Sequence, residues 1–171
     1  GAFGPFAEQT AEAQAEMIRL NCEALVILTH GLVPPMLERR RGGVMLVAST
    51  ASFQPTPLFA TYAATKAFVR SFGEALAEEL RGSGVTINVL CPGPVHTGFQ
   101  ARAGSHIGGS QRSLVLDADE TVRQGLVAYE RGAVVFVPGT TNRVGATLAS
   151  VLPNRLVVRA VARMMRDRGE R

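Results

Sequence analysis

The sequence predicts an α/β fold in which helices cover both faces of a parallel sheet. Three short runs of apolar residues are each bounded by glycine, serine or proline, and longer segments with helical spacing separate them. Because these runs are continuously apolar, each strand is expected to be buried on both faces, as in a parallel sheet. Strands joined by helices in this order need crossover connections, which place helices on both faces.

Residues 10–40 are predicted to form one long helix. Thr10 is a suitable N-cap residue, and Glu12 lies in the first turn, where the helix dipole favours a carboxylate. Apolar residues recur at helical spacing between Met17 and Leu28. This helix leads into the first strand.

Prolines and glycines mark the end of this helix. Pro34 and Pro35 are expected to bend or interrupt it, because proline lacks the amide hydrogen that a helix needs. Gly42-Gly43 is expected to stop it. The apolar residues 44–48 are then predicted to form the first strand.

The remaining elements alternate in the same way. We expect, in order, a helix at residues 59–81, a strand at 85–90, a long loop at 97–115, a helix at 117–130, a strand at 133–137 and a helical carboxyl end.

Two polar or turn-forming segments directly follow predicted strands. Ser49 follows the first strand, and Pro92-Gly93 follows the second. The carboxyl ends of parallel strands meet at one edge of a sheet, where ligands bind in such folds. A site is therefore expected where these segments meet.

Composition argues against a nucleic-acid-binding protein. The formal net charge is +4, and residues 152–171, with six arginines against two acidic residues, account for all of it. The rest of the chain is balanced and carries no basic face. Tryptophan is absent and aromatic residues make up 6%, which disfavours a base-stacking surface.

The two cysteines, Cys22 and Cys91, are too few for a disulfide framework or a metal site. We expect reduced thiols in a cytoplasmic protein, with no metal ligand. No signal peptide opens the chain, and no run reaches the roughly 18–20 apolar residues of a spanning helix.

Lys66 is the only lysine, beside seventeen arginines. Tyr62 lies four residues earlier, so both side chains share one helix face. A nearby ammonium stabilises a phenolate and lowers the tyrosine pKa from about 10, which suits a general acid or base. An ordinary exposed pair is the alternative, but Ser49 at the end of a buried strand favours a site.

Four segments together resemble the short-chain dehydrogenase/reductase family in order and spacing. They are Val47-Ala48-Ser49, Phe53-Gln54-Pro55, Tyr62-Ala63-Ala64-Thr65-Lys66-Ala67-Phe68, and Asn88-Val89-Leu90-Cys91-Pro92-Gly93-Pro94-Val95-His96-Thr97. The thirteen-residue interval from Ser49 to Tyr62 is similar to that of the family's compact branch. The resemblance implies the carboxyl-terminal half of a doubly wound Rossmann-type sheet.

The resemblance implies an NAD(P)-dependent oxidoreductase acting on a small carbonyl or alcohol substrate. Tyr62 would exchange a proton with the substrate oxygen, and Ser49 would hydrogen-bond that oxygen. Lys66 would bind the nicotinamide ribose and lower the Tyr62 pKa, and Asn21 would hold a water in a proton relay.

The same resemblance implies where the cofactor lies. Besides Tyr62 and Lys66, the residues expected to line its nicotinamide end are Pro92, Gly93, Val95 and Thr97. Residues 98–110 are expected to form a mobile flap over the substrate.

The family's glycine-rich phosphate-binding turn has no counterpart here. The residue that selects NAD or NADP belongs to the same front part. Gly1 would correspond to a motif after the family's fourth strand, so we expect a piece of a longer enzyme. The first predicted strand would then be left with a bare edge.

Residues 152–171 are predicted to form a basic amphipathic helix that completes the domain of residues 1–151. This helix can pack on its own domain or a second subunit, or make weak contact with an anionic membrane. It resembles the longer end of a subgroup of reductases of lipid-like or bulky carbonyl compounds, which favours NADP(H) over NAD(H). A homodimer or homotetramer through the two long helices is also expected.

Two other functions stay open at this point. One is a non-catalytic binding or membrane-associated module, which would not require Ser49, Tyr62, Lys66 and Asn21 together. The other is an epimerase or dehydratase on the same scaffold, which the short interval between Ser49 and Tyr62 disfavours.

Overall fold

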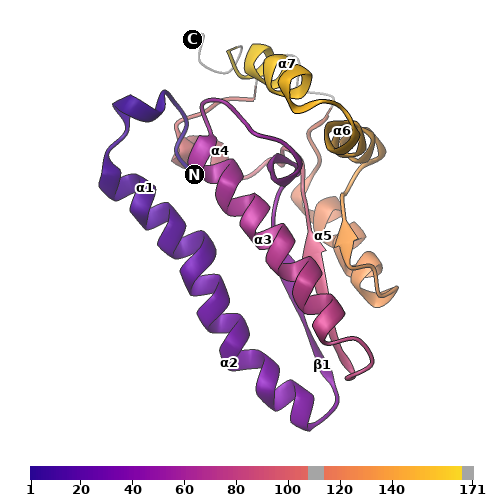
Figure 1. Ribbon diagram of the computed structural model, residues 1–171. Helices are drawn as coiled ribbons and strands as arrows, with labels where there is room; N and C mark the ends of the chain where they lie inside the picture. The colour runs from indigo at the N-terminus through magenta and orange to yellow at the C-terminus, as the bar shows by residue number, and fades with distance from the viewer. Residues whose placement is uncertain (108–113, 167–171) are drawn as a thin grey trace.

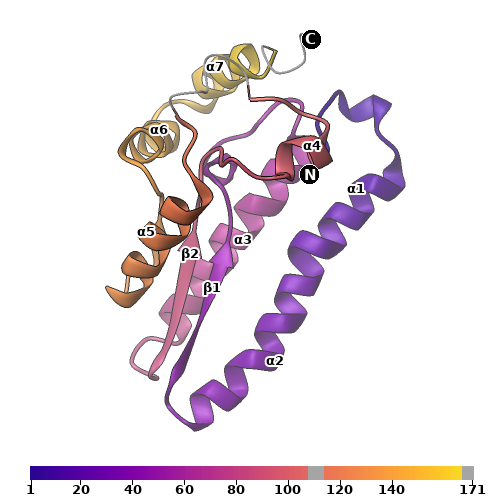
Figure 2. The same cartoon turned by 180° about the vertical axis from the view of Figure 1, so that it is seen from behind.

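The computed structural model describes residues 1–107 and 114–166, and its centre is one parallel sheet (Figures 1 and 2). The strands are β1 (Gly42–Val47), β2 (Val85–Leu90) and β3 (Val135–Phe136), in the order β1-β2-β3. Gly42 pairs with Val85, and the register continues to Val47 and Leu90. The predicted α/β class and the alternation of helices and strands are confirmed.

Helices lie on both faces of this sheet. On one face is α3 (Ala60–Glu79), whose Gly73 lies so close to Val89 and Leu46 that a Cβ would overlap the Val89 side chain. On the other face is α5 (Ala118–Glu130), which packs on Leu90 (Figure 2). The central strand is therefore sealed from both sides, and Val89 is fully buried.

The first helical segment follows a short 3-10 turn at Phe6–Glu8 and has three parts in one continuous rod. These are α1 (Ala11–Ile18), a π-helical turn (Arg19–Glu23) and α2 (Ala24–Glu38). Thr10 caps it as predicted, since its hydroxyl accepts the Ala13 N–H at 3.2 Å. The π turn was not predicted.

The predicted interruption at Pro34 and Pro35 is wrong, because α2 runs on to Glu38. Each proline leaves a carbonyl without its helical partner, at His30 and Gly31. Both of those residues are exposed, so water can take the place of the missing amide.

The two glycines after this helix have a different role from the predicted one. The helix ends before Arg40, whose positive φ of 50° reverses the chain. Gly42 and Gly43 are instead the first residues of β1, and a Cβ on Gly43 would overlap the Tyr129 hydroxyl. Gly43 is therefore a glycine because α5 lies close to the sheet there, whereas Gly42 has a positive φ of 153° and lies against the Met36 side chain of α2.

The carboxyl-terminal part contains more helix and less strand than predicted. The expected loop at 97–115 includes α4 (Phe99–Ala103), and β3 has two residues because Pro138 offers no N–H to the ladder. Of the proposed flap, residues 108–110 lie outside the described residues. The chain continues through α6 (Thr140–Val151) and α7 (Asn154–Arg166).

The basic helix α7 packs on its own domain. Its buried side chains, Val157, Val161 and Met165, form a second apolar cluster with Phe59 and Ala103. The arginines of its described residues are exposed. α7 therefore covers the region above the amino end of α3 (Figure 1).

Within the described residues, the segment Ala11–Glu38 is long and apolar enough by length and composition to cross a membrane, with a hydropathy of 1.3. The expectation that no segment reaches this length and apolarity is therefore wrong, although a core helix of a soluble protein meets the same criterion. This segment also contacts α3 through the Asn21–Thr65 hydrogen bond.

Candidate active site

A cavity of about 1090 Å³ opens at the carboxyl ends of β1 and β2, the edge at which the sequence predicts a site. All eight residues singled out from the sequence line it. They are Asn21, Ser49, Tyr62, Lys66, Pro92, Gly93, Val95 and Thr97. The fold thus brings together residues from the π turn, from α3 and from the loops after two strands.

Ser49 is held between the two strand ends. It caps the 3-10 turn at Thr50–Phe53, because its Oγ accepts the Ala51 N–H at 3.1 Å. The same Oγ lies 3.4 Å from the Pro92 carbonyl oxygen, and the Thr50 N–H donates to that carbonyl at 2.8 Å. The hydroxyl therefore has a fixed position at the polar end of the cavity.

Tyr62 and Lys66 lie on one face of α3, as their spacing predicts. The Lys66 Nζ donates to the Val47 carbonyl at 2.8 Å and is 5.8 Å from the centre of the Tyr62 ring. The ring itself packs between Phe59 and Phe99, with centroid distances of 5.5 and 5.4 Å. Apolar packing on two sides orients the phenol beside the ammonium.

Burial lowers the pKa of Lys66 below its ordinary value, and the neighbouring thiols Cys22 and Cys91 act in the opposite direction. Burial raises the pKa of Cys22 and raises that of Cys91 to about 11. Both thiols are therefore protonated at neutral pH, and they do not neutralise the ammonium. Lys66 supplies positive charge next to the Tyr62 ring.

Asn21 is aimed at α3 by the π turn. Its Nδ2 donates to the Thr65 Oγ1 at 3.0 Å, and that hydroxyl donates to the Tyr62 carbonyl at 2.8 Å. A π turn inserts one residue into the helical repeat and often marks a functional position. Thr65 was missed by the sequence analysis, although it lies between Tyr62 and Lys66 in the motif.

The loop after β2 forms the opposite wall. The Val95 backbone bridges to Leu116, and the Thr97 Oγ1 accepts the Phe99 N–H at 3.2 Å. Gly93 was expected to be a glycine so that a cofactor could approach. Its nearest neighbour is the Asn142 side chain, which also lines the cavity and was also missed.

Many of the other side chains that line the cavity are apolar. Those contributed by α3, α4, α6 and α7 include Phe59, Phe99, Leu148, Leu152, Val157, Val161, Met164 and Met165. The arrangement suits a ligand with one polar reacting group and a large apolar part. Among residues 1–107 and 114–166, no three His, Cys, Asp or Glu side chains gather as a metal site would require.

Comparison with known protein families agrees with this geometry. The family model for short chain dehydrogenases matches residues 1–108 of the chain. The chain therefore belongs to the short-chain dehydrogenase family.

Curated relatives narrow the group of similar proteins. The very-long-chain 3-oxoacyl-CoA reductase of Phaeosphaeria nodorum is 41% identical over 86 residues, and that of Laccaria bicolor is 36% identical over 85. Each match covers 50% of this chain and 25% of the relative. The chain thus spans about a quarter of the length of these relatives.

Solved structures share the fold over most of the chain. A short-chain dehydrogenase from Sphingobium yanoikuyae in complex with NADPH has a TM-score of 0.75 and 28% identity, covering 90% of this chain and 62% of that one. A Burkholderia cenocepacia short-chain dehydrogenase in complex with NADP has a TM-score of 0.72 at 21% identity, covering 96% of this chain and 65% of that one. The second likeness concerns the fold alone.

Proposed function

We propose that this chain carries the proton-handling part of a nicotinamide-dependent oxidoreductase that interconverts a carbonyl and an alcohol. The observation that carries the proposal is the convergence of Asn21, Ser49, Tyr62 and Lys66 on one cavity. These four come from the π turn, the end of β1 and α3, and a binding module would need no such set.

In this proposal the Tyr62 phenol donates a proton to the substrate carbonyl oxygen as it becomes a hydroxyl. The Ser49 hydroxyl, held beside the Pro92 carbonyl, hydrogen-bonds the same oxygen and polarises it. The Lys66 ammonium stabilises the phenolate that the proton leaves behind. The nicotinamide, when bound, supplies the hydride.

The residues present fit the nicotinamide end of such a cofactor. Lys66 and Tyr62 offer an ammonium and a phenol on one side of the cavity, and Pro92, Gly93 and Val95 offer a close-packed wall on the other. The π turn contributes Asn21, which lines the same cavity as Lys66 and in this proposal holds a water that relays a proton toward Lys66.

The substrate we propose is a carbonyl compound with a long or bulky apolar group, and the cofactor is NADP(H). The apolar lining from α6 and α7 supports this substrate class. The relatives' name, very-long-chain 3-oxoacyl-CoA reductase, points the same way. NADP(H) is supported by the NADPH complex of the similar structure.

The test is the oxidation of NADPH and NADH by the intact protein, with 3-oxoacyl thioesters of increasing chain length. We expect turnover with NADPH to exceed that with NADH, and kcat/KM to rise with chain length as methylenes enter the apolar part. Absence of NADPH oxidation with every member of the series would contradict the proposal. A decrease with chain length would contradict the substrate class alone.

We also propose that a second copy of the chain covers the outer face of the two long helices, α2 and α3. Ile27, Leu28 and Leu32 form an apolar stripe along α2 and are 48–65% exposed, and Phe68 of α3 is 42% exposed. An apolar stripe of this size is unusual on a free surface. Sedimentation of the intact protein should show a dimer or tetramer, and a monomer at micromolar concentration would contradict this.

A further inference from the structure

A buried amide lies at the beginning of α6, beside the proposed site. Asn142 is 6% exposed, and its Nδ2 donates to the Leu114 carbonyl at 3.0 Å and to the Pro138 carbonyl at 3.2 Å. Both donor hydrogens of one amide group are therefore used. Asn142 joins two backbone segments that are distant in the sequence.

The same amide packs directly on the loop after β2. A Cβ built on Gly93 would lie 2.5–2.6 Å from three atoms of the Asn142 amide, closer than carbon atoms approach without overlap. Gly93 has no positive φ, so its backbone does not require glycine. Within the described residues, the Asn142 side chain is what excludes a larger residue at position 93.

Asn142 is also linked indirectly to the loop after β2, because it binds the Leu114 carbonyl and the segment after Leu114 contacts that loop. The segment after Leu114 pairs with the loop, because Leu116 N–H donates to the Pro94 carbonyl at 3.1 Å and His96 N–H donates to the Leu116 carbonyl at 3.2 Å. The cavity wall formed by Pro92–Val95 therefore contacts the Asn142 side chain at Gly93 and the backbone of Leu116 at Pro94.

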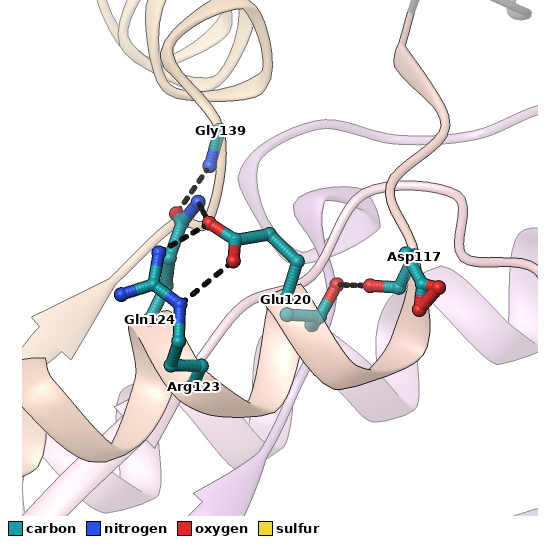
Figure 3. Close-up of polar contacts among 6 residues, drawn as sticks. Asp117, Glu120, Arg123, Gln124 and Gly139 are labelled. Atoms are coloured by element: carbon teal, nitrogen blue, oxygen red, sulfur yellow. Dashed lines mark hydrogen bonds and ion pairs between the residues drawn. The ribbon is translucent and has the colours of Figure 1, made fainter.

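The first turn of α6 is itself anchored to α5 (Figure 3). Gly139 N–H donates to the Gln124 Oε1 at 3.0 Å, and the Gln124 Nε2 donates to Glu120 at 2.7 Å. Glu120 also accepts two hydrogen bonds from the Arg123 guanidinium. The amide of Asn142 therefore projects from a turn whose position is fixed.

We propose that Asn142 is a positioning residue that sets the place of the Pro92–Val95 wall, and that Gly93 is a glycine to accommodate Asn142. This inference rests on the proposed function, in which that wall lines the nicotinamide end of the cofactor. Asn142 acts through the loop and does not touch the reacting atoms.

A double-mutant cycle on the intact protein tests this pairing, with NADPH affinity measured by isothermal titration calorimetry. Gly93→Ala and Asn142→Ala should each weaken NADPH binding about tenfold, because each displaces the same wall. The double variant should bind NADPH no more weakly than the worse single variant. Additive losses, about a hundredfold together, would show that Gly93 and Asn142 act separately and would overturn the inference.

Rescue gives a second measurement if Asn142→Ala fails to fold. Asn142→Ser is smaller and keeps one donor, so in the Gly93→Ala background it should restore NADPH affinity to within about threefold of the parent. A double variant as weak as Gly93→Ala alone would overturn the inference. Gly31→Ala is the matched control, because its Cβ meets no atom within 4 Å, and its affinity should be unchanged.

Comparing kcat with the KM for NADPH distinguishes a role of Asn142 in positioning the cavity wall from a general loss of protein stability. In Asn142→Ala, kcat at saturating NADPH should stay within about twofold of the parent while the KM for NADPH rises in parallel with the dissociation constant. An equal fall in kcat at saturation would contradict a positioning role. A parent protein that binds no NADPH would refute the proposed function and this inference together, whereas additive losses in a binding parent refute the inference alone.

Discussion

At the scale of single residues, the partly buried ammonium of Lys66 lowers the stability of the fold but places a positive charge beside Tyr62. The side chain is half-buried beside the Tyr62 ring, and its ammonium has the Val47 carbonyl as a hydrogen-bond partner. Burial lowers the pKa of Lys66, so the folded state pays for keeping the charge there. A group retained against this cost, in a chain that otherwise uses arginine, points to a chemical role.

The first prediction concerns Lys66→Met. The lowered pKa means that the unfolded state binds more protons than the folded state between the folded-state pKa of Lys66 and its ordinary value of 10.5. The stability of the parent relative to Lys66→Met should therefore rise with pH through this window. The raised pKa values of Cys22 and Cys91 act in the opposite direction, but both thiols are present in the two proteins. Urea unfolding of both proteins from pH 7 to 10.5 measures this.

The same variant separates stability from activity. Lys66→Met should unfold at the same or a higher urea concentration than the parent at pH 7, while turnover is lost. Lys66→Arg, which keeps the charge in a larger planar group, is the control and should lose turnover too. A stability difference between the parent and Lys66→Met that stays flat or falls from pH 7 to 10.5 would contradict the account of the buried ammonium.

At the scale of elements, the π turn at Arg19–Glu23 is what presents Asn21 to α3. Thr65 is 3% exposed, and its hydroxyl links Asn21 to the backbone of Tyr62. The orientation of the Tyr62 turn thus depends on a helix that is remote in sequence.

Thr65→Val tests this link between elements. The variant keeps the side-chain shape and removes the hydroxyl, which should lower the free energy of unfolding by about 1 kcal/mol. Because Asn21 then loses its partner, Asn21→Ala should cost less in the Thr65→Val background than in the parent, as measured by urea unfolding. If Asn21→Ala lowers the free energy of unfolding equally in the two backgrounds, the hydrogen bond does not couple Asn21 to Thr65.

The elements also show which features were predictable from sequence. The bounds of β2 were predicted correctly, because Gly84 and Pro92 enclose a short, mostly apolar run rich in β-branched residues. The break at Pro34-Pro35 was predicted wrongly, because exposure of the preceding turn is not visible in a local pattern.

The site was predictable only in part, for the same reason. The sequence located Ser49, Tyr62, Lys66 and Asn21 through motif spacing, and the structure brings them to one cavity. Asn142 had no such signal, because it stands among other polar residues and its partner Gly93 lies on another element. Contacts between distant segments decide such roles, and a local pattern does not report them.

At the scale of the whole molecule, the surface beside β1 is exposed. β1 is an edge of the sheet in the described part of the chain, and Val47 at its end is 51% exposed. Unpaired strand edges next to apolar surface promote association between chains. The 171 residues therefore present more apolar surface than a stable monomer usually does.

The prediction at this scale is that the 171-residue chain, purified alone, self-associates. Light scattering should show a mass that increases with protein concentration, because the β1 edge and the α2 stripe are both uncovered. A monodisperse monomer with a single cooperative unfolding transition would contradict this.

The measurement that tests the central claim most directly is single-turnover oxidation of bound NADPH by Tyr62→Phe in the intact protein. The account predicts that NADPH affinity stays within about threefold of the parent while the rate of carbonyl reduction falls about 10²–10⁴-fold, since the proton donor alone is removed. Tyr62→Phe also keeps the ring that packs between Phe59 and Phe99, so the fold should be unaffected. A variant that reduces the substrate at the parent rate would show that Tyr62 is not the proton donor.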